Sequence, residues 1–212
     1  MENKKLQIVH EQACLQTSEA LARLIGRHAI VDIVKPKIEK VKEVVLSFGL
    51  AEAVAAICLP VGGQVKGIAM LLFSQDTAFA LSDLLTKKGP GATGQLTEMD
   101  KSALQELGNI ICGTYFSILS KHTGLKMIEH VAQFAFDKLP VLLEQTITNF
   151  AENQENILAV ETEFDFSVPA LKGRFFKTHF AVLFESTQFE AILASLEEAE
   201  RDFIEETVTG RI

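Results

Sequence analysis

Hydrophobic and polar residues follow two spacings along this chain, and each spacing predicts one kind of element. Apolar residues three and four positions apart are typical of helices with one buried face, whereas apolar runs and strict alternation are typical of strands. The helical spacing predicts helices over about 6–27, 76–87, 98–122 and 187–205. The other pattern predicts strands over 28–34, 51–59, 64–73, 125–131, 157–168 and 175–184, with a hairpin turn at Pro60-Val-Gly-Gly63. No element is predicted for the variable stretch 132–156.

The predicted elements occur in the same order in the two halves of the chain. Leu71-Leu-Phe-Ser-Gln-Asp-Thr-Ala-Phe79 parallels Val182-Leu-Phe-Glu-Ser-Thr-Gln-Phe189, and 20–26 parallels 118–124. Such a repeat favours one pseudo-symmetric α/β domain over two independent ones. We therefore expect a single domain over 1–212, with a first repeat at about 6–87, a linker at 88–96 and a second repeat at about 97–208.

The linker is rich in glycine and proline, and it precedes the start of a helix. Both properties are typical of loops that bind phosphate, so Lys87-Lys-Gly-Pro-Gly-Ala-Thr-Gly-Gln95 is a candidate phosphate cradle. The segment lacks the Gly-Lys-Ser/Thr ending of a P-loop. We therefore interpret it as a connection between the repeats.

Composition places the chain among ordinary globular proteins and argues against several functional classes. Of its 212 residues, 48% are hydrophobic and 23% are charged, and the net charge is −8. This acidity argues against nucleic acid and against an anionic membrane surface as partners, because both attract basic proteins. No apolar run approaches the ~20 residues that span a bilayer, and no signal peptide is visible. The basic segment Lys35-Pro-Lys-Ile-Glu-Lys-Val-Lys42 is interpreted as a solvated loop.

Cysteine and histidine spacings indicate neither a disulfide framework nor a metal site. Cys14, Cys58 and Cys112 are odd in number and widely spaced, which favours structural thiols in a reducing cytoplasm. The five histidines include no H-x-x-x-H pair, and each is interpreted as a surface or partly buried residue.

The helix predicted over 98–122 has one apolar and one polar face. Thr97 and Asp100 have the spacing of a capping box, which places the start of the helix there. Three- and four-residue spacing defines a buried stripe of Leu104, Leu107, Ile111, Tyr115, Ile118 and Leu119. The opposite face carries Ser102, Glu106, Asn109, Gly113, Ser117 and Ser120.

Glu106 and Asn109 are the chemically distinctive residues of this polar face. They lie about 60° apart on the helix and one turn from each other. Their neighbours Ser102, Gly113 and Ser117 have short side chains, so a partner could approach closely. A mid-helix glycine costs about 0.5–1 kcal/mol relative to alanine, which points to a packing or docking reason. The alternatives are a solvated surface for the polar pair, and close packing within this protein for Gly113.

The sequence of this helix resembles the signature helix of the CheC/CheX/FliY phosphatases. The family pattern, close to E-I-G-N-I-x-x-G-x-Y, is matched at Glu106, Gly108, Asn109, Ile110, Gly113 and Tyr115. The resemblance implies a phosphatase that acts on the phosphorylated chemotaxis response regulator CheY. It also implies a duplicated CheC-like α/β (α+β) fold with one mixed β-sheet and long helices packed on its faces. The receptor deamidase CheD is implied as a further partner.

Phosphoryl transfer from an aspartyl phosphate requires mainly positioning and charge stabilisation. The Asn109 carboxamide can accept a hydrogen bond from the attacking water while its NH₂ faces the phosphoryl oxygens. By resemblance, Glu106 binds the invariant lysine of the regulator, and Ser102, Gly113 and Ser117 accommodate the docked partner. No cofactor is expected on this chain, because the regulator supplies its own Mg²⁺. Neither nucleic acid nor membrane insertion is expected.

The first repeat is expected to lack this chemistry. Aligning Gly26 with Gly124 places Ile8 against Glu106 and Glu11 against Asn109. A carboxylate would repel the phosphoryl oxygens where an amide would donate to them. We therefore expect one active face, although doubly active members of the family have two. Two other functions remain open: a non-catalytic chemotaxis or flagellar adaptor, and a phosphatase for a regulator outside motility.

Overall fold

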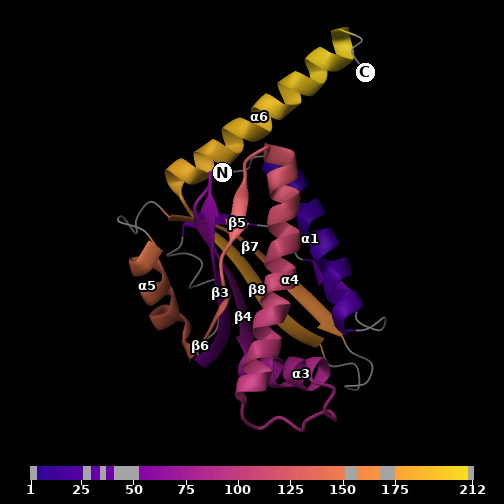
Figure 1. Ribbon diagram of the computed structural model, residues 1–212, viewed down its shortest axis with the longest axis vertical. Helices are drawn as coiled ribbons and strands as arrows, with labels where there is room; N and C mark the ends of the chain where they lie inside the picture. Colours follow the sequence, from indigo (N-terminus) through magenta and orange to yellow (C-terminus); the bar gives the residue numbers. More distant parts are fainter. Residues whose placement is uncertain are drawn as a thin grey trace.

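The computed structural model describes residues 4–25, 30–33, 37–40, 53–150, 157–167 and 175–209, which form an α+β fold (Figure 1). The helices in these ranges are α1 (Lys4–Ile25), α3 (Gln75–Leu85), α4 (Glu98–Thr123), α5 (Leu139–Phe150) and α6 (Ser186–Thr209). The strands are β1 (Ile30–Ile33), β2 (Lys37–Lys40), β3 (Ala53–Gly63), β4 (Gly67–Ser74), β5 (Met127–Glu129), β6 (Gln133–Lys138), β7 (Ile157–Ser167) and β8 (Phe175–Glu185). The fold class expected from the sequence is confirmed.

Strands from both halves of the chain form one sheet. Its order is β1-β7-β8-β4-β3-β5, with β2 also paired to β7 and β6 also paired to β3. The halves meet where β4 pairs with β8, between Leu71 and Phe180 among other positions. A mixed sheet was expected, but every pairing between described strands is antiparallel.

The sheet is covered on both faces, so its central strands carry apolar residues without polar alternation. Ile57 and Leu71 point to the larger core, which also receives side chains from α1, α3, α4 and α6. Ala56 and Met70 point to a smaller core that α5 covers. Figure 1 shows α1 and α4 side by side over the sheet, and α5 apart from them. A strand with two covered faces reads as a continuous apolar run.

The hairpin turn predicted at Pro60–Gly63 is wrong, because β3 continues through these residues and the chain turns at 64–66. Pro60 is tolerated because its carbonyl accepts a hydrogen bond from the backbone N–H of His130, between β5 and β6. The N–H that proline lacks would point to the same side, toward the break between β5 and β6, where neither strand pairs with Pro60. Gly63 takes the positive φ of 101° that the exit from the strand requires.

Two other segments also differ from the prediction. Within the stretch expected to be a basic loop, Lys37–Lys40 forms β2, which pairs with β7. Within the stretch for which no element was predicted, β6 and α5 form. The strand β6 has mostly exposed or half-buried residues and lies at the edge of the sheet, so its sequence lacks the apolar run of a central strand.

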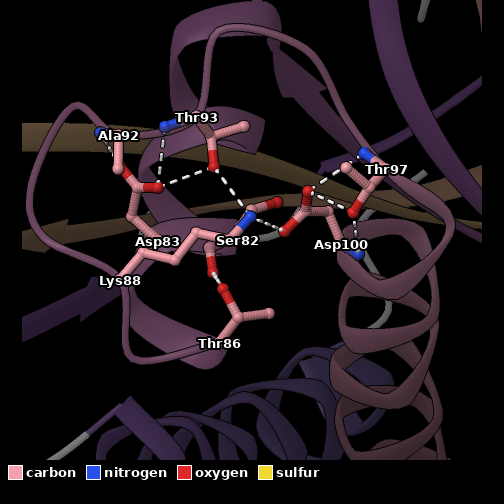
Figure 2. Close-up of polar contacts among 8 residues, drawn as sticks. All are labelled: Ser82, Asp83, Thr86, Lys88, Ala92, Thr93, Thr97 and Asp100. Carbon is pink, nitrogen blue, oxygen red and sulfur yellow. Dashed lines mark hydrogen bonds and ion pairs between the residues drawn. The ribbon is translucent and has the colours of Figure 1, made fainter.

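A polar network holds the loop between α3 and α4 (Figure 2). The buried Asp83 carboxylate accepts hydrogen bonds from the backbone N–H groups of Ala92 and Thr93, each at 3.0 Å, and from the Thr93 hydroxyl at 2.6 Å. Two of the loop N–H groups that could have faced a phosphate therefore face a carboxylate of the protein itself. This arrangement supports the interpretation of 87–95 as a connection.

The same network reaches the start of α4. Lys88 Nζ donates to Thr93 Oγ1 at 3.3 Å and to Asp100 Oδ1 at 2.6 Å. Burial alone would raise the pKa of the Asp100 carboxyl, but hydrogen bonds from Lys88 and Thr97 outweigh it and lower the pKa. The network thus fixes the first turn of α4 to the end of α3.

Within the described ranges, none of the helices combines the length and the apolar character that crossing a bilayer requires.

We expect Asp83→Ala to lower the free energy of unfolding by about 2–4 kcal/mol, because it leaves buried donors of the loop without acceptors. Asp76→Ala is the matched control, since Asp76 is exposed in the first turn of the same helix. Its cost should stay below about 1 kcal/mol. Urea unfolding of the three proteins measures both values, and equal stabilities of the two variants would contradict the role given to Asp83.

Candidate functional site

The polar face of α4 lies on the surface. Ser102, Glu106, Asn109 and Ser117 are exposed, and Gly113 between them is half-buried. Among the described residues, neither Glu106 nor Asn109 has a hydrogen-bonded or ion-paired side chain. Ser120 differs from the prediction, because its hydroxyl is buried and has no partner in the described part of the chain. The exposed stripe therefore ends before Ser120.

Both ends of α4 are capped, and the cap at its start is the one that the sequence predicts. Thr97 and Asp100 form the reciprocal bonds of a capping box, with Thr97 N donating to Asp100 Oδ2 at 3.0 Å. Gly124 ends the helix with a φ of 68°, which is the left-handed conformation that glycine adopts without strain. The predicted stripe of apolar residues is buried throughout. These contacts fix the rotation of the helix, and thereby the direction in which Glu106 and Asn109 point.

The two interior glycines of α4 have different environments. A Cβ atom on Gly108 would lie 2.5 Å from Cγ2 of Ile57 on β3, so the helix crosses the sheet too closely for any side chain there. A Cβ atom on Gly113 would meet nothing within 4 Å among the described residues. Close packing therefore explains Gly108 and does not explain Gly113, which leaves open space beside the exposed stripe.

A buried histidine links α4 to α1. The His10 ring is 1% exposed, and its Nδ1 lies 2.8 Å from the Tyr115 hydroxyl, while its Nε2 lies 3.2 Å from Cys14 Sγ. A neutral imidazole can satisfy both contacts, since one nitrogen accepts and the other donates. His10 was interpreted as a surface or partly buried residue. That interpretation is wrong, because its polar partners lie on α1 itself and on a helix more than 100 residues away, which local spacing does not reveal.

Burial sets the protonation states around this link. Desolvation lowers the pKa of His10 to about 4 and raises the pKa of Tyr115 well above its usual range. Burial likewise raises the pKa of the Cys112 thiol, with a smaller contribution from the charge of Glu129. The three groups are therefore neutral near pH 7.

The first-repeat positions lie on α1, beside α4. Ile8 is 56% exposed, and Glu11 is exposed and accepts a hydrogen bond from Gln7 Nε2 at 3.3 Å. This face of α1 thus presents an apolar side chain and a carboxylate where the exposed face of α4 presents a carboxylate and an amide. In the described part of the chain, no group of three or more His, Cys, Asp or Glu residues is arranged to hold a metal ion.

Comparison with known proteins shows which sequences this site resembles. Residues 99–128, which include most of α4 and the start of β5, match the model of the CheC-like family. The chain is 26% identical over 184 residues to the CheY-P phosphatase CheC of Bacillus subtilis (strain 168), covering 85% of this chain and 86% of that protein.

Solved structures share the fold. FliY of Thermotoga maritima matches with a TM-score of 0.72 at 16% identity, covering 94% of this chain and 98% of that chain. A chain in a CheX–CheY–BeF3–Mg+2 complex from Borrelia burgdorferi matches with a TM-score of 0.53 at 18% identity, covering 82% of this chain and 97% of that chain. The resemblance noted in the sequence is confirmed. The chain thus resembles the CheC-like family model over 99–128, resembles CheC in sequence over most of its length, and shares its fold with the FliY structure.

The two glycines of α4 make opposite predictions for stability. Gly108→Ala should lower the free energy of unfolding by about 1–3 kcal/mol, because Ile57 occupies the space of the new methyl group. Gly113→Ala should raise it by about 0.5–1 kcal/mol, because the site is open and alanine favours the helix. Chemical denaturation of both variants tests the pair, and a Gly108→Ala protein as stable as the wild type would contradict the packing argument.

The buried His10 predicts a loss of stability in mild acid. Its pKa is about 4 in the folded protein and about 6.5 in the unfolded chain, so only the unfolded state gains a proton as the pH falls through this window. We expect the free energy of unfolding to be about 2 kcal/mol lower at pH 5 than at pH 7 from this residue. His10→Gln should lose this part of the pH dependence, whereas His122→Gln, at a half-buried position on α4, should retain it. An unchanged pH dependence in His10→Gln would show that another group is responsible.

Proposed function

We propose that this protein is a chemotaxis-type phosphatase that accelerates hydrolysis of the aspartyl phosphate on a CheY-like response regulator. The observation that carries the proposal is the exposed pair Glu106 and Asn109 on a helix capped at both ends, with no intramolecular partner for either side chain among the described residues. A rigid element that holds two unpaired polar groups toward solvent suits insertion into the active site of another protein. The CheC relative of B. subtilis is named for this activity, which supports the assignment.

In this proposal Asn109 positions the attacking water. Its carboxamide oxygen accepts a hydrogen bond from the water, and its NH₂ group donates to the phosphoryl oxygens, so the amide aligns the nucleophile without adding negative charge. The regulator supplies the Mg²⁺ that neutralises the phosphoryl group, and this chain therefore contributes side chains alone. Glu106, one turn away, binds a cation at the rim of the regulator's active site.

The open side of α4 serves the approach of the regulator. Asn109 reaches a recessed phosphate only if its neighbours do not hold the partner away. Ser102 and Ser117 have short side chains on the same stripe, and the empty space above Gly113 leaves room for the partner's backbone. This docking role accounts for a glycine that internal packing does not require.

We assign the activity to the second repeat alone. On α1, Glu11 occupies the position that corresponds to Asn109, and a carboxylate there would repel a phosphoryl group. Ile8 corresponds to Glu106 and cannot bind a cation.

A non-catalytic adaptor is the second candidate. Its support is the absence of the amide from the first repeat, together with the likeness in fold to FliY. The adaptor would bind the regulator, or CheD, through the same surfaces without accelerating hydrolysis. The presence of both Glu106 and Asn109 favours the phosphatase, because binding alone does not require a group that orients water.

The proposal is tested by phosphate release from a phosphorylated CheY-type receiver domain in the presence of Mg²⁺. The wild type should accelerate release over the receiver alone, and Asn109→Ala should reduce that acceleration by about 10²–10³-fold. Glu106→Ala should reduce it as well. The matched control is Glu11→Ala, which removes an exposed helical carboxylate from α1 and should keep the activity of the wild type.

Three results would be informative against the proposal. Full activity of Asn109→Ala would exclude the mechanism, and loss of activity in Glu11→Ala would contradict the assignment to one repeat. A wild type that binds the receiver without accelerating release would place the protein among adaptors.

A further inference from the structure

The connection between β5 and β6 runs alongside α4 in the opposite direction (Figure 1). One direct contact ties the two together, because Gln105 Nε2 on α4 donates to the backbone carbonyl of Ala132 at 2.7 Å. Further along, Lys101 Nζ lies 5.9 Å from the centre of the Phe134 ring on β6.

The hydrogen bond at Ala132 fixes the register between the connection and the helix. From Gln105 to Asn109, α4 advances about 6 Å, and the two residues from Ala132 back to His130 span up to about 7 Å when extended. Because the connection runs opposite to α4, residues 130 and 131 lie beside the turn of α4 that contains Asn109. On the helix, Asn109 is about 40° from Gln105, so it lies on the side of the exposed stripe that borders this connection.

The residues at this border have the chemistry of a contact surface. Val131 is 82% exposed, more than any other large hydrophobic residue among those described. Glu129 is exposed and points to the α4 side of the sheet, because it alternates along β5 with Ile128 and shares its side with the buried Met127. Glu106 on α4 and Glu129 at the end of β5 are thus both exposed carboxylates on the α4 side of the sheet.

A single exposed apolar residue is ordinary on a protein surface. Two facts distinguish Val131. It lies beside the pair that the proposed function uses, and the hydrogen bond from Gln105 holds its segment to the same helix as Asn109. Met99, 69% exposed, lies at the start of the same helical stripe. Apolar contacts are therefore available at two places around Glu106 and Asn109.

We propose that residues 129–131 form a second wall of the regulator-docking surface, with Val131 as its apolar contact and Glu129 as a second site for a cation. This inference rests on the proposed function for the identity of the partner. The partner that fits is a receiver domain with an apolar side chain and a lysine or arginine at the rim of its phosphoaspartate site. Gln105 acts as a positioning residue, since it holds the wall at a fixed distance from α4.

The wall selects the regulator, and Asn109 performs the chemistry. Changing Val131 should weaken docking without altering the positioned water once the complex has formed, so the half-saturating receiver concentration should change while the rate at saturation should not. Glu129 should act mainly through attraction of a cation, so its contribution should decrease as salt is added.

The test compares Val131→Asp with Ile128→Asp in phosphate-release assays over a range of phosphorylated receiver concentrations. Ile128 is a matched control because it is an exposed apolar residue on β5, just before the connection that carries Val131, and its side chain lies on the opposite face of the sheet. We expect Val131→Asp to raise the half-saturating concentration at least about tenfold, with a saturating rate within about twofold of the wild type. Ile128→Asp should change neither value by more than about twofold. Glu129→Gln should raise the half-saturating concentration at low salt and lose that effect at high salt.

Binding to a receiver loaded with beryllofluoride and Mg²⁺ separates this inference from the proposed function. If the wild type accelerates release but Val131→Asp behaves like Ile128→Asp in both measurements, the second wall is excluded and the phosphatase stands. If the wild type binds without accelerating release and Val131→Asp alone weakens binding, the wall stands and the phosphatase is excluded. Thermal unfolding of each variant confirms that the comparison is made between folded proteins.

Discussion

The close contact between α4 and β3 at Gly108 is the constraint on which the rest of the structure depends. Because Gly108 has no side chain, Ile57 packs against the helix backbone, and the helix lies low over the sheet. This fixed approach buries the whole apolar stripe of α4 and turns its opposite face outward. The direction of Glu106 and Asn109 is therefore determined from the far side of the helix, by packing rather than by any contact of their own.

Polar interactions also hold α4 in place, by attaching it to the neighbouring helices. The network of Asp83, Lys88 and Asp100 attaches the first turn of α4 to α3, and the contact between His10 and Tyr115 attaches its middle to α1. Asp83, Asp100, His10 and Tyr115 are buried, where an unsatisfied polar group would be costly, so each set of contacts favours a single arrangement of the helices. On the exposed face of α4, the side chains of Glu106 and Asn109 have no hydrogen-bond or ion-pair partner among the described residues, so they can bind another protein.

The helices α1 and α4 lie side by side over the sheet and present different side chains to solvent (Figure 1). Both α1 and α4 pack on the same core and are joined by His10 and Tyr115. They differ in the side chains that they present to solvent, since Ile8 and Glu11 stand where α4 has Glu106 and Asn109. In the proposed function, α1 and α4 pack on the sheet in similar ways, but only the exposed residues of α4 support hydrolysis. The reason is that the carboxylate of Glu11 cannot replace the amide of Asn109 beside a phosphoryl group.

The sequence by itself determined the elements whose own residues carry the signal. The capping box and buried stripe of α4, the helical span of α1, and the apolar runs of β4 and β8 follow from local spacing, since burial on one or both faces imposes a fixed period. Tertiary structure alone decided the rest. The edge strand β6, the strand β2 and the burial of His10 depend on partners distant in sequence. Likewise, Gly108 and Gly113 are identical in the sequence, and only the position of Ile57 separates a packing glycine from one that faces open space.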